Sequence, residues 1–242
     1  IINTQNNSII YTVDYSAFVS NNKLSLIVRS TLKEGSNQYP VHYSGSNTSG
    51  EKSFEEFVTK NRQVIVDFFT KAEMNRQIQQ LKKKHSNVIS AKVGSMFGCD
   101  VWVPEELERY KSGESFLWAS SDQPRSDVSL NFVIYSYPYT DKNTFTKDFF
   151  VHKRDSVMKV NIPGSNEGQY MQTEAEYVNV KDFVVRGEYA FEARGLWYMK
   201  NDMMGGPFVS HVRVDRPNGR IVVVEAFVYA PEKKKRDLIR KM

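Results

Sequence analysis

The stretch Phe208–Tyr229, which reads FVSHVRVDRPNGRIVVVEAFVY, decides the fold of this chain. Apolar residues run through Phe208–Val214 and again through Arg220–Tyr229, with polar residues between many of them. The segment Asp215–Gly219 between the two runs contains Asn-Gly, the dipeptide most typical of a tight β-hairpin turn. The stretch therefore predicts a pair of antiparallel strands.

Four more segments are predicted to be strands because they are rich in β-branched and aromatic residues and are bounded by turn residues. They are Val88–Val103, Ser115–Ala119, Leu130–Tyr137 and Phe183–Met199.

Three segments are predicted to be helices. Apolar residues from Phe54 to Leu81 follow helical spacing, with Ser53 as the N-cap and Glu56 completing a capping box. A second helix is expected over Lys142–Val160, where Asp141 offers a cap, and a third begins at Pro231.

The predicted fold class is α+β, with helices packed on a mainly antiparallel sheet. Residues 1–53 are expected to form a separate N-terminal part of strands and loops, and residues 54–242 an α+β domain. Within that domain, 54–140 and 141–242 are candidate related halves. Each half has a strand with a Trp, at Trp118 and Trp197, followed by a strand that ends in Tyr and Pro.

Charge and composition restrict the classes of function. The 33 Lys and Arg against 28 Asp and Glu give +5, well short of a nucleic-acid-binding footprint, so no nucleic acid partner is expected. No segment has the roughly 18 uncharged apolar residues of a membrane span. The first residues lack a signal peptide's features, so any export signal is expected to have been removed or never to have been present.

A set of polar residues on the predicted strands is the first candidate site. Glu188, Glu192 and Arg194 share one face of a strand by the alternation rule, and a hairpin through Met203–Gly206 would bring His211 and Arg213 beside them. The set could bind a small acidic or sugar-like ligand. Alternatively, it is a solvent-exposed face stabilised by cross-strand charge pairs, which is the commoner arrangement.

The turn itself is the second candidate. Met203, Met204 and Phe208 could form a soft exposed contact for a partner or a lipid surface, as flexible methionines often do. The alternative is that these side chains belong to the core.

No metal site, cofactor or catalytic residue is predicted. The histidines His42, His85, His152 and His211 are scattered, and the single cysteine, Cys99, has no second ligand at metal-binding spacing. A catalytic role for Cys99 would need a nearby base, and the sequence identifies none.

Several motifs keep their order along the chain and carry a resemblance to a known family. They include Asp67–Arg76, Ser95–Pro104, Tyr135–Tyr139, Phe150–Val157, Glu192–Trp197 and Met204–His211. With them the chain resembles, from about Phe54 to its end, the Bacteroidetes lipoprotein family filed as domain of unknown function 4837. The resemblance implies an exported precursor with a lipid-modified cysteine upstream, tethered to an envelope membrane and facing the periplasm or the cell exterior. It implies no reaction and no catalytic residues.

Three functions remain open, in decreasing order of expectation. The first is a non-catalytic module that binds an envelope protein or a small ligand, touching the membrane through its upstream anchor alone. The second is a structural envelope lipoprotein. The third is an envelope hydrolase acting on glycan or peptide, with Glu188, Glu192, Arg194 and His211 converging in a cleft.

Overall fold

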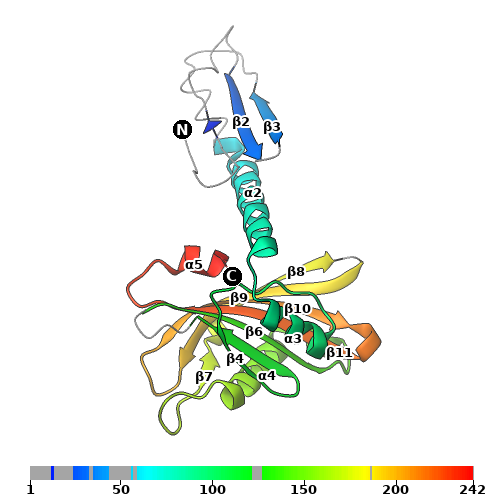
Figure 1. The fold of residues 1–242 in the computed structure, drawn as a ribbon, viewed down its shortest axis with the longest axis vertical. Helices are drawn as coiled ribbons and strands as arrows, with labels where there is room; N and C mark the ends of the chain where they lie inside the picture. The colour runs from blue at the N-terminus through cyan, green and yellow to red at the C-terminus, as the bar shows by residue number, and fades with distance from the viewer. Residues whose placement is uncertain are drawn as a thin grey trace. The chain divides into compact units, whose positions relative to one another are not determined.

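Alternating apolar residues build one curled antiparallel sheet in the computed structural model, which describes residues 12–13, 24–32, 35–43, 56, 59–121, 127–185 and 187–241 (Figure 1). The strand order is β4-β5-β6-β11-β10-β9-β7, and β8 also pairs with β9. The strands are β4 (Arg109–Ser112), β5 (Phe116–Ser120), β6 (Ser129–Pro138), β7 (Met171–Thr173), β8 (Asn179–Val185), β9 (Glu188–Met199), β10 (Gly205–Asp215) and β11 (Arg220–Tyr229).

The chain divides into two compact units, Ile1–Gln80 and Leu81–Met242. The first contains a separate antiparallel sheet of β1 (Thr12–Val13), β2 (Leu24–Leu32) and β3 (Gly35–Tyr43). Strands are therefore present within residues 1–53, where strands and loops were expected, while residues 44–53 lie outside the described residues.

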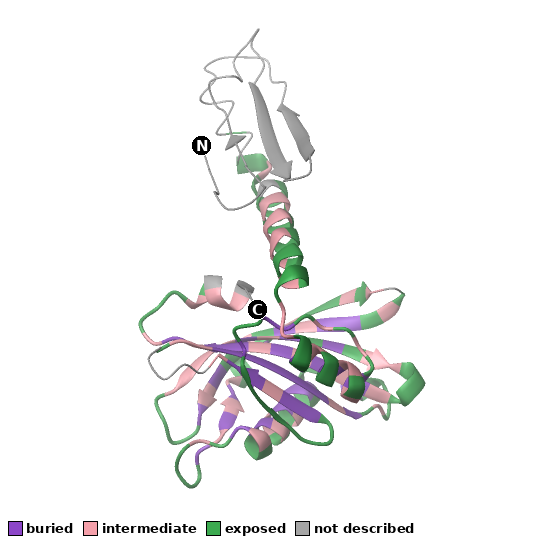
Figure 2. Cartoon of the chain, in the orientation of Figure 1, coloured by how far each residue is buried: buried purple, intermediate pink, exposed green. Residues whose placement is uncertain are grey.

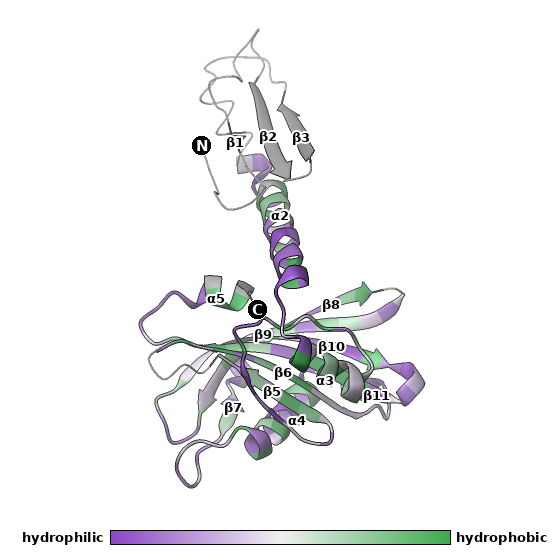
Figure 3. Ribbon diagram, in the orientation of Figure 1, coloured by the Kyte–Doolittle hydropathy of each residue, from purple (hydrophilic) through white to green (hydrophobic). Residues whose placement is uncertain are grey.

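Helix α2 (Arg62–Lys83) confirms most of the long helix predicted from the apolar spacing, but it begins eight residues later than the predicted start at Phe54. The proposed N-cap, Ser53, lies outside the described residues. The first turns of α2 are apolar and its last turns polar, ending in Lys82 and Lys83, where cations suit the helix dipole (Figure 3).

The sheet of the second unit has a core on each face, because successive side chains on a strand point to opposite sides. Helix α4 (Lys147–Asn161) packs on one face and α3 (Asn87–Phe97) on the other, and we call these the α4 face and the α3 face. On β11, Val223 and Phe227 belong to the α4 face and Val228 to the α3 face. Figure 2 shows the buried residues concentrated along the central strands.

Helix α3 corrects the prediction of a strand over Val88–Val103. Ser86 caps the helix by accepting from the amide of Ile89, and Gly98 ends it with a left-handed φ of 65°. Ile89, Val93 and Phe97, four residues apart, form its buried stripe. The β-branched content of the segment favoured a strand, but this spacing and these caps favour a helix.

Two more predictions are corrected in detail. The predicted strand Phe183–Met199 is a hairpin, since β8 and β9 are separated by a two-residue turn in which Gly187 has a φ of 81°. The predicted helix Lys142–Val160 is two pieces, η2 (Lys142–Phe145) and α4. Asp141 caps the first in a capping box, and Thr146 caps the second.

The hairpin predicted from Asn-Gly is confirmed. Strands β10 and β11 pair in antiparallel register from Phe208↔Phe227 to Asp215↔Arg220, and the turn is η4 (Arg216–Asn218) followed by Gly219 with a φ of 58°. The final helix, α5 (Lys235–Lys241), begins four residues later than predicted and packs Leu238 and Ile239 against the core of the α3 face.

The architecture is broadly α+β, with the sheet dominating and few helices covering it. One sheet runs through both candidate halves, because β6 from the first lies beside β11 from the second, so a relation between the halves stays a prediction. Among the described residues, no helix is long and apolar enough to cross a membrane.

Candidate functional site

Three of the predicted site residues lie together on the α3 face, and we call them the outer set: Glu192, Arg194 and His211. His211 on β10 lies directly opposite Glu192 on β9, with Nε2 of His211 3.1 Å from Oε2 of Glu192. Nη2 of Arg194 donates to the same oxygen at 3.0 Å, and its Nε donates to Oε1. The β9–β10 hairpin thus brings His211 beside Glu192 and Arg194.

The backbone register explains this contact. The pair Val185↔Glu188 closes the β8–β9 turn and exchanges hydrogen bonds, so every second residue of β9 from Glu188 bonds to β8. Glu192 is one of these, and therefore Glu192 and His211 form a non-hydrogen-bonded pair across β9 and β10. Side chains approach most closely in such pairs.

Apolar and basic side chains surround the outer set on the same face. The ring of Phe183 on β8 packs edge-on against His211, with centroids 5.6 Å apart. Lys181 lies opposite Glu192, and Leu196 is 40% exposed on β9. Helix α3 packs instead on β5, β6 and β11, which leaves this part of the α3 face accessible among the described residues.

The electrostatics of the outer set keep Glu192 ionised. The hydrogen bond from His211, against the opposing effect of burial and with further help from Arg194, lowers the pKa of Glu192 to about 2. Glu192 therefore holds a charge at neutral pH that Arg194 compensates, and it is a poor proton donor there.

The other two polar candidates lie apart from this contact. Glu188 accepts from Nε of Arg216 at 2.7 Å, at the end of the sheet. Arg213 lies opposite Ala190, exposed on the α3 face. The five polar candidates therefore all lie on the α3 face, but their side chains do not converge on one point.

The side chains of the second candidate, Met203, Met204 and Phe208, lie partly at the surface and partly in the core. Met203 is fully exposed at 100%, whereas Met204 packs against the core of the α4 face. Phe208 is 1% exposed and lies under the guanidinium of Arg154, whose Cζ is 4.2 Å from the ring centroid. The exposed contact predicted for Phe208 is therefore wrong, since β10 directs this side chain into the core.

A buried polar cluster on the α4 face was not predicted, and we call it the inner network: Arg154, Asp155, Thr173, Ser210 and Glu225. Arg154 of α4 and Glu225 of β11 are both fully buried and form a bidentate pair, with Nε–Oε2 at 2.9 Å and Nη2–Oε1 at 2.7 Å. The Ser210 hydroxyl donates to Oε2 of Glu225 at 2.7 Å. Every member thus has a partner, as buried charges require.

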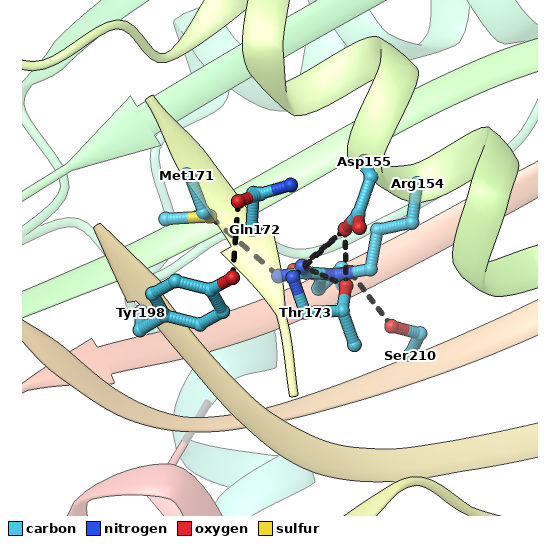
Figure 4. A network of polar contacts seen from close by, with 8 residues as sticks. Arg154, Asp155, Met171, Gln172, Thr173, Tyr198 and Ser210 are labelled. Atoms are coloured by element: carbon cyan, nitrogen blue, oxygen red, sulfur yellow. Dashed lines mark hydrogen bonds and ion pairs between the residues drawn. The ribbon is translucent and has the colours of Figure 1, made fainter. Parts of the chain in front are cut away.

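The inner network extends through β7 (Figure 4). Nη1 of Arg154 donates to the Thr173 hydroxyl at 2.8 Å, and the Thr173 amide and hydroxyl both donate to Oδ1 of Asp155, at 2.8 and 2.5 Å. Burial alone would lower the pKa of Arg154, but Glu225 raises it by charge and hydrogen bonding, so Arg154 stays cationic. Burial raises the pKa of Asp155, against the hydrogen bonds from Thr173.

A signal for the inner network does exist in the sequence. Arg154 lies within the apolar stripe of α4, among Phe150, Val151 and Met158, and Glu225 alternates with the apolar residues of β11. A charged residue at such a position needs a buried partner. Which partner it has depends on the fold, since 71 residues separate the two.

Within the described ranges, no side chains are assembled for metal binding or for nucleophilic catalysis. No three His, Cys, Asp or Glu side chains come close enough there to hold a metal ion. Cys99 is half-buried, and burial raises the pKa of its thiol, which disfavours the reactive thiolate.

Comparison with curated proteins and with solved structures gave no match. The motifs that carry the resemblance from Ser95 onward, however, all lie in a segment that matches a protein family. Residues 86–242, which span the whole sheet with α3, α4 and α5, match it. This chain therefore belongs to the family described as Domain of unknown function (DUF4837).

Proposed function

We propose that this chain is a non-catalytic binding domain of the bacterial cell envelope, tethered by a lipid anchor upstream and belonging to a Bacteroidetes lipoprotein. Its recognition surface is the accessible part of the α3 face, which we call the β8–β10 surface: Lys181, Phe183, Glu192, Arg194, Leu196, His211 and Arg213. The partner we propose is an envelope protein that presents carboxylates.

The observation that carries this proposal is the composition of the β8–β10 surface. Leu196 is 40% exposed two residues along β9 from Arg194, and the ring of Phe183 packs against His211. Apolar side chains next to Arg are typical of protein interfaces. Lys181, Arg194 and Arg213 outnumber Glu192, so the surface has an excess of positive charge. Such an excess favours an acidic partner and a faster association at low salt.

The hydrolase alternative has less support. A glycan hydrolase needs two carboxyl groups facing each other, one of them with a raised pKa. Glu188 and Glu192 are four residues apart on one strand, about 13 Å along it, and Glu188 pairs with Arg216. The pKa of Glu192 is about 2, which is the opposite of what a general acid requires.

The test is recovery of a partner from solubilised envelope with the full, anchored chain as bait. The variant Lys181→Glu/Arg194→Glu reverses two charges on the β8–β10 surface. The control Lys142→Glu/Lys147→Glu reverses two exposed charges on η2 and α4, at the α4 face. Both change the net charge equally, and both must retain the unfolding midpoint of the parent.

We expect a specific partner whose recovery falls about tenfold or more with the first variant and is kept with the control, a loss of about 1.4 kcal/mol in binding. Raising the salt concentration should weaken recovery of the same partner by the parent chain. Equal recovery by the two double variants would exclude the β8–β10 surface.

A further inference from the structure

Strand β8 is an edge strand, because it pairs with β9 and with no other described strand. The pair Val185↔Glu188 closes a two-residue turn, so it exchanges both backbone hydrogen bonds. In an antiparallel ladder the bonded pairs alternate, so Lys181 and Phe183 also bond to β9. The N–H and C=O groups of Val180, Asp182 and Val184 therefore point away from the sheet.

Outside the strand ladders, no backbone hydrogen bond of these three residues to another described residue is present. A row of unpaired donors and acceptors on an edge strand is a template for another strand. Proteins protect such edges with short strands, charges, Pro or a covering segment.

The other edges of the sheet are protected in these ways, which makes β8 the exception. Strand β4 has four residues, all exposed, with Arg109 and Lys111 among them. Strand β7 has three residues, and the chain from α4 flanks it through the bridge Pro163↔Tyr170 and the bond from the Met171 amide to the Ile162 carbonyl. Strand β8 has seven residues, four of them Val or Phe.

The side chains beside the unpaired groups alternate with a defined charge pattern. Val180, Asp182 and Val184 point to the α4 face, opposite Ala193, Phe191 and Tyr189 of β9. Val184 is 69% exposed. The Tyr189 hydroxyl donates to Oδ1 of Asp182 at 2.7 Å, which holds the carboxylate in place between the two valines.

We propose that β8 binds an extended segment of a partner protein, which adds to the sheet as an antiparallel strand. The segment has a basic residue opposite Asp182 and apolar residues opposite Val180 and Val184, since opposite-charge and apolar pairs stabilise neighbouring strands. This proposal rests on the proposed role as a binding domain, but it uses the backbone edge of β8 instead of the β8–β10 surface.

A second copy of this chain fits the edge poorly. The symmetric register that pairs Val180 with Val184 of the other copy places the two Asp182 carboxylates directly opposite each other. Like charges in that position destabilise the pairing. Charge complementarity therefore favours a different chain with a basic residue at this position.

The first test uses two labelled synthetic peptides with the full chain. The sequences are Thr-Val-Thr-Lys-Thr-Val-Thr and the same peptide with Glu in place of Lys. Fluorescence anisotropy should show that the Lys peptide binds about tenfold or more tightly than the Glu peptide, and Asp182→Lys should reverse this preference. Equal affinities, or no binding of either peptide, would overturn the proposal.

Amide hydrogen exchange provides a second readout that needs no variant. In the free protein the amides of Val180, Asp182 and Val184 should exchange rapidly while those of Lys181 and Phe183 are protected, and the Lys peptide should protect all five. Protection of the outward amides in the free protein would overturn the proposal.

A variant that removes a backbone N–H distinguishes binding through the backbone edge of β8 from binding through its side chains. Val184→Pro removes an outward N–H without removing a bond to β9, and Val184→Thr retains the N–H. The proline variant should lose peptide binding, and the threonine variant should keep it. A dimer that Val184→Pro abolishes would show that a second copy is the occupant and would overturn the proposal.

The proposal for the β8 edge and the proposed function of the β8–β10 surface can be disproved independently of each other. The peptides meet the outward backbone groups of β8 and side chains on the α4 face, whereas Lys181 and Arg194 point to the α3 face, so the two sets of measurements test different surfaces. If the peptides fail while envelope recovery still depends on Lys181 and Arg194, the edge proposal falls and the proposed function stands.

Discussion

Ser210 and His211 are neighbours on β10, yet they belong to polar clusters with opposite properties. Ser210 points to the α4 face and bonds to the buried Arg154–Glu225 pair. His211 points to the α3 face, where its side chain is 52% exposed beside Glu192. One step along a strand thus separates the buried charges of the inner network from the solvent-exposed charges of the outer set.

The physical difference between the two clusters is solvation. The side chains of Arg154 and Glu225 are both 0% exposed, so each needs the other to compensate for the loss of water. Arg194 is 59% exposed and can exchange Glu192 for water at little cost. The inner network is therefore expected to control stability, and the outer set is available for binding.

Breaking the inner network should have the largest effect. Arg154→Met leaves Glu225 buried without its partner and should reduce the free energy of unfolding by about 3–5 kcal/mol, measured by urea denaturation. Lys147→Met, an exposed change on the same helix, should stay within about 0.5 kcal/mol. A loss below about 1 kcal/mol for Arg154→Met would mean that the pair is not buried as described.

Removing the second charge tests the same point further. Arg154→Met/Glu225→Leu should recover part of the stability lost by Arg154→Met, because no unpaired charge remains. A double variant less stable than the single one would show that the pair contributes more than mutual compensation.

The β9–β10 hairpin should show an intermediate effect. A Cβ at Gly206 would lie 2.0 Å from the Val228 carbonyl oxygen, so Gly206→Ala forces the backbones of β10 and β11 apart. We expect a loss of about 1–3 kcal/mol. Met203→Ala, at a fully exposed side chain, should change the thermal midpoint very little. Similar losses for the two variants would contradict the division of this hairpin into core and surface.

The outer set should show the smallest effect on stability. Glu192→Gln removes its ion pairs and should cost at most about 1 kcal/mol at pH 7. The pKa of Glu192 falls from its ordinary 4.5 to about 2, so the stabilising contribution is present above about pH 4.5 and is lost as the pH falls toward 2. The difference in unfolding free energy between the parent and Glu192→Gln should therefore be smaller at pH 3 than at pH 7. An unchanged difference at both pH values would contradict this assignment.

Local patterns in the sequence predict much of the sheet. Asn218–Gly219 predicts the β10–β11 hairpin because the left-handed φ of Gly219 is required there. Asp141 predicts the start of the helical segment because its side chain caps η2. These features depend on residues that are close in the sequence, and therefore they can be predicted from the sequence alone.

The remainder depends on contacts between distant segments. The β-branched residues near Val88 indicate a strand, but the helix there forms because Ile89, Val93 and Phe97 can cover β5, β6 and β11. The outer set was predicted because a hairpin joins its strands, whereas the inner network needs α4 to cross β11. The burial of Phe208 follows from the same crossing, since Arg154 covers its ring.

The central claim is that recognition takes place on the β8–β10 surface, and site-specific photo-cross-linking in cells tests it most directly. Benzoyl-phenylalanine would replace Leu196 on that surface or Val160 at the end of α4, which are 40% and 75% exposed. We expect a discrete cross-linked product from position 196 and none from position 160, despite the greater exposure of the latter. A product from position 160 alone, or the same product from both positions, would contradict the claim.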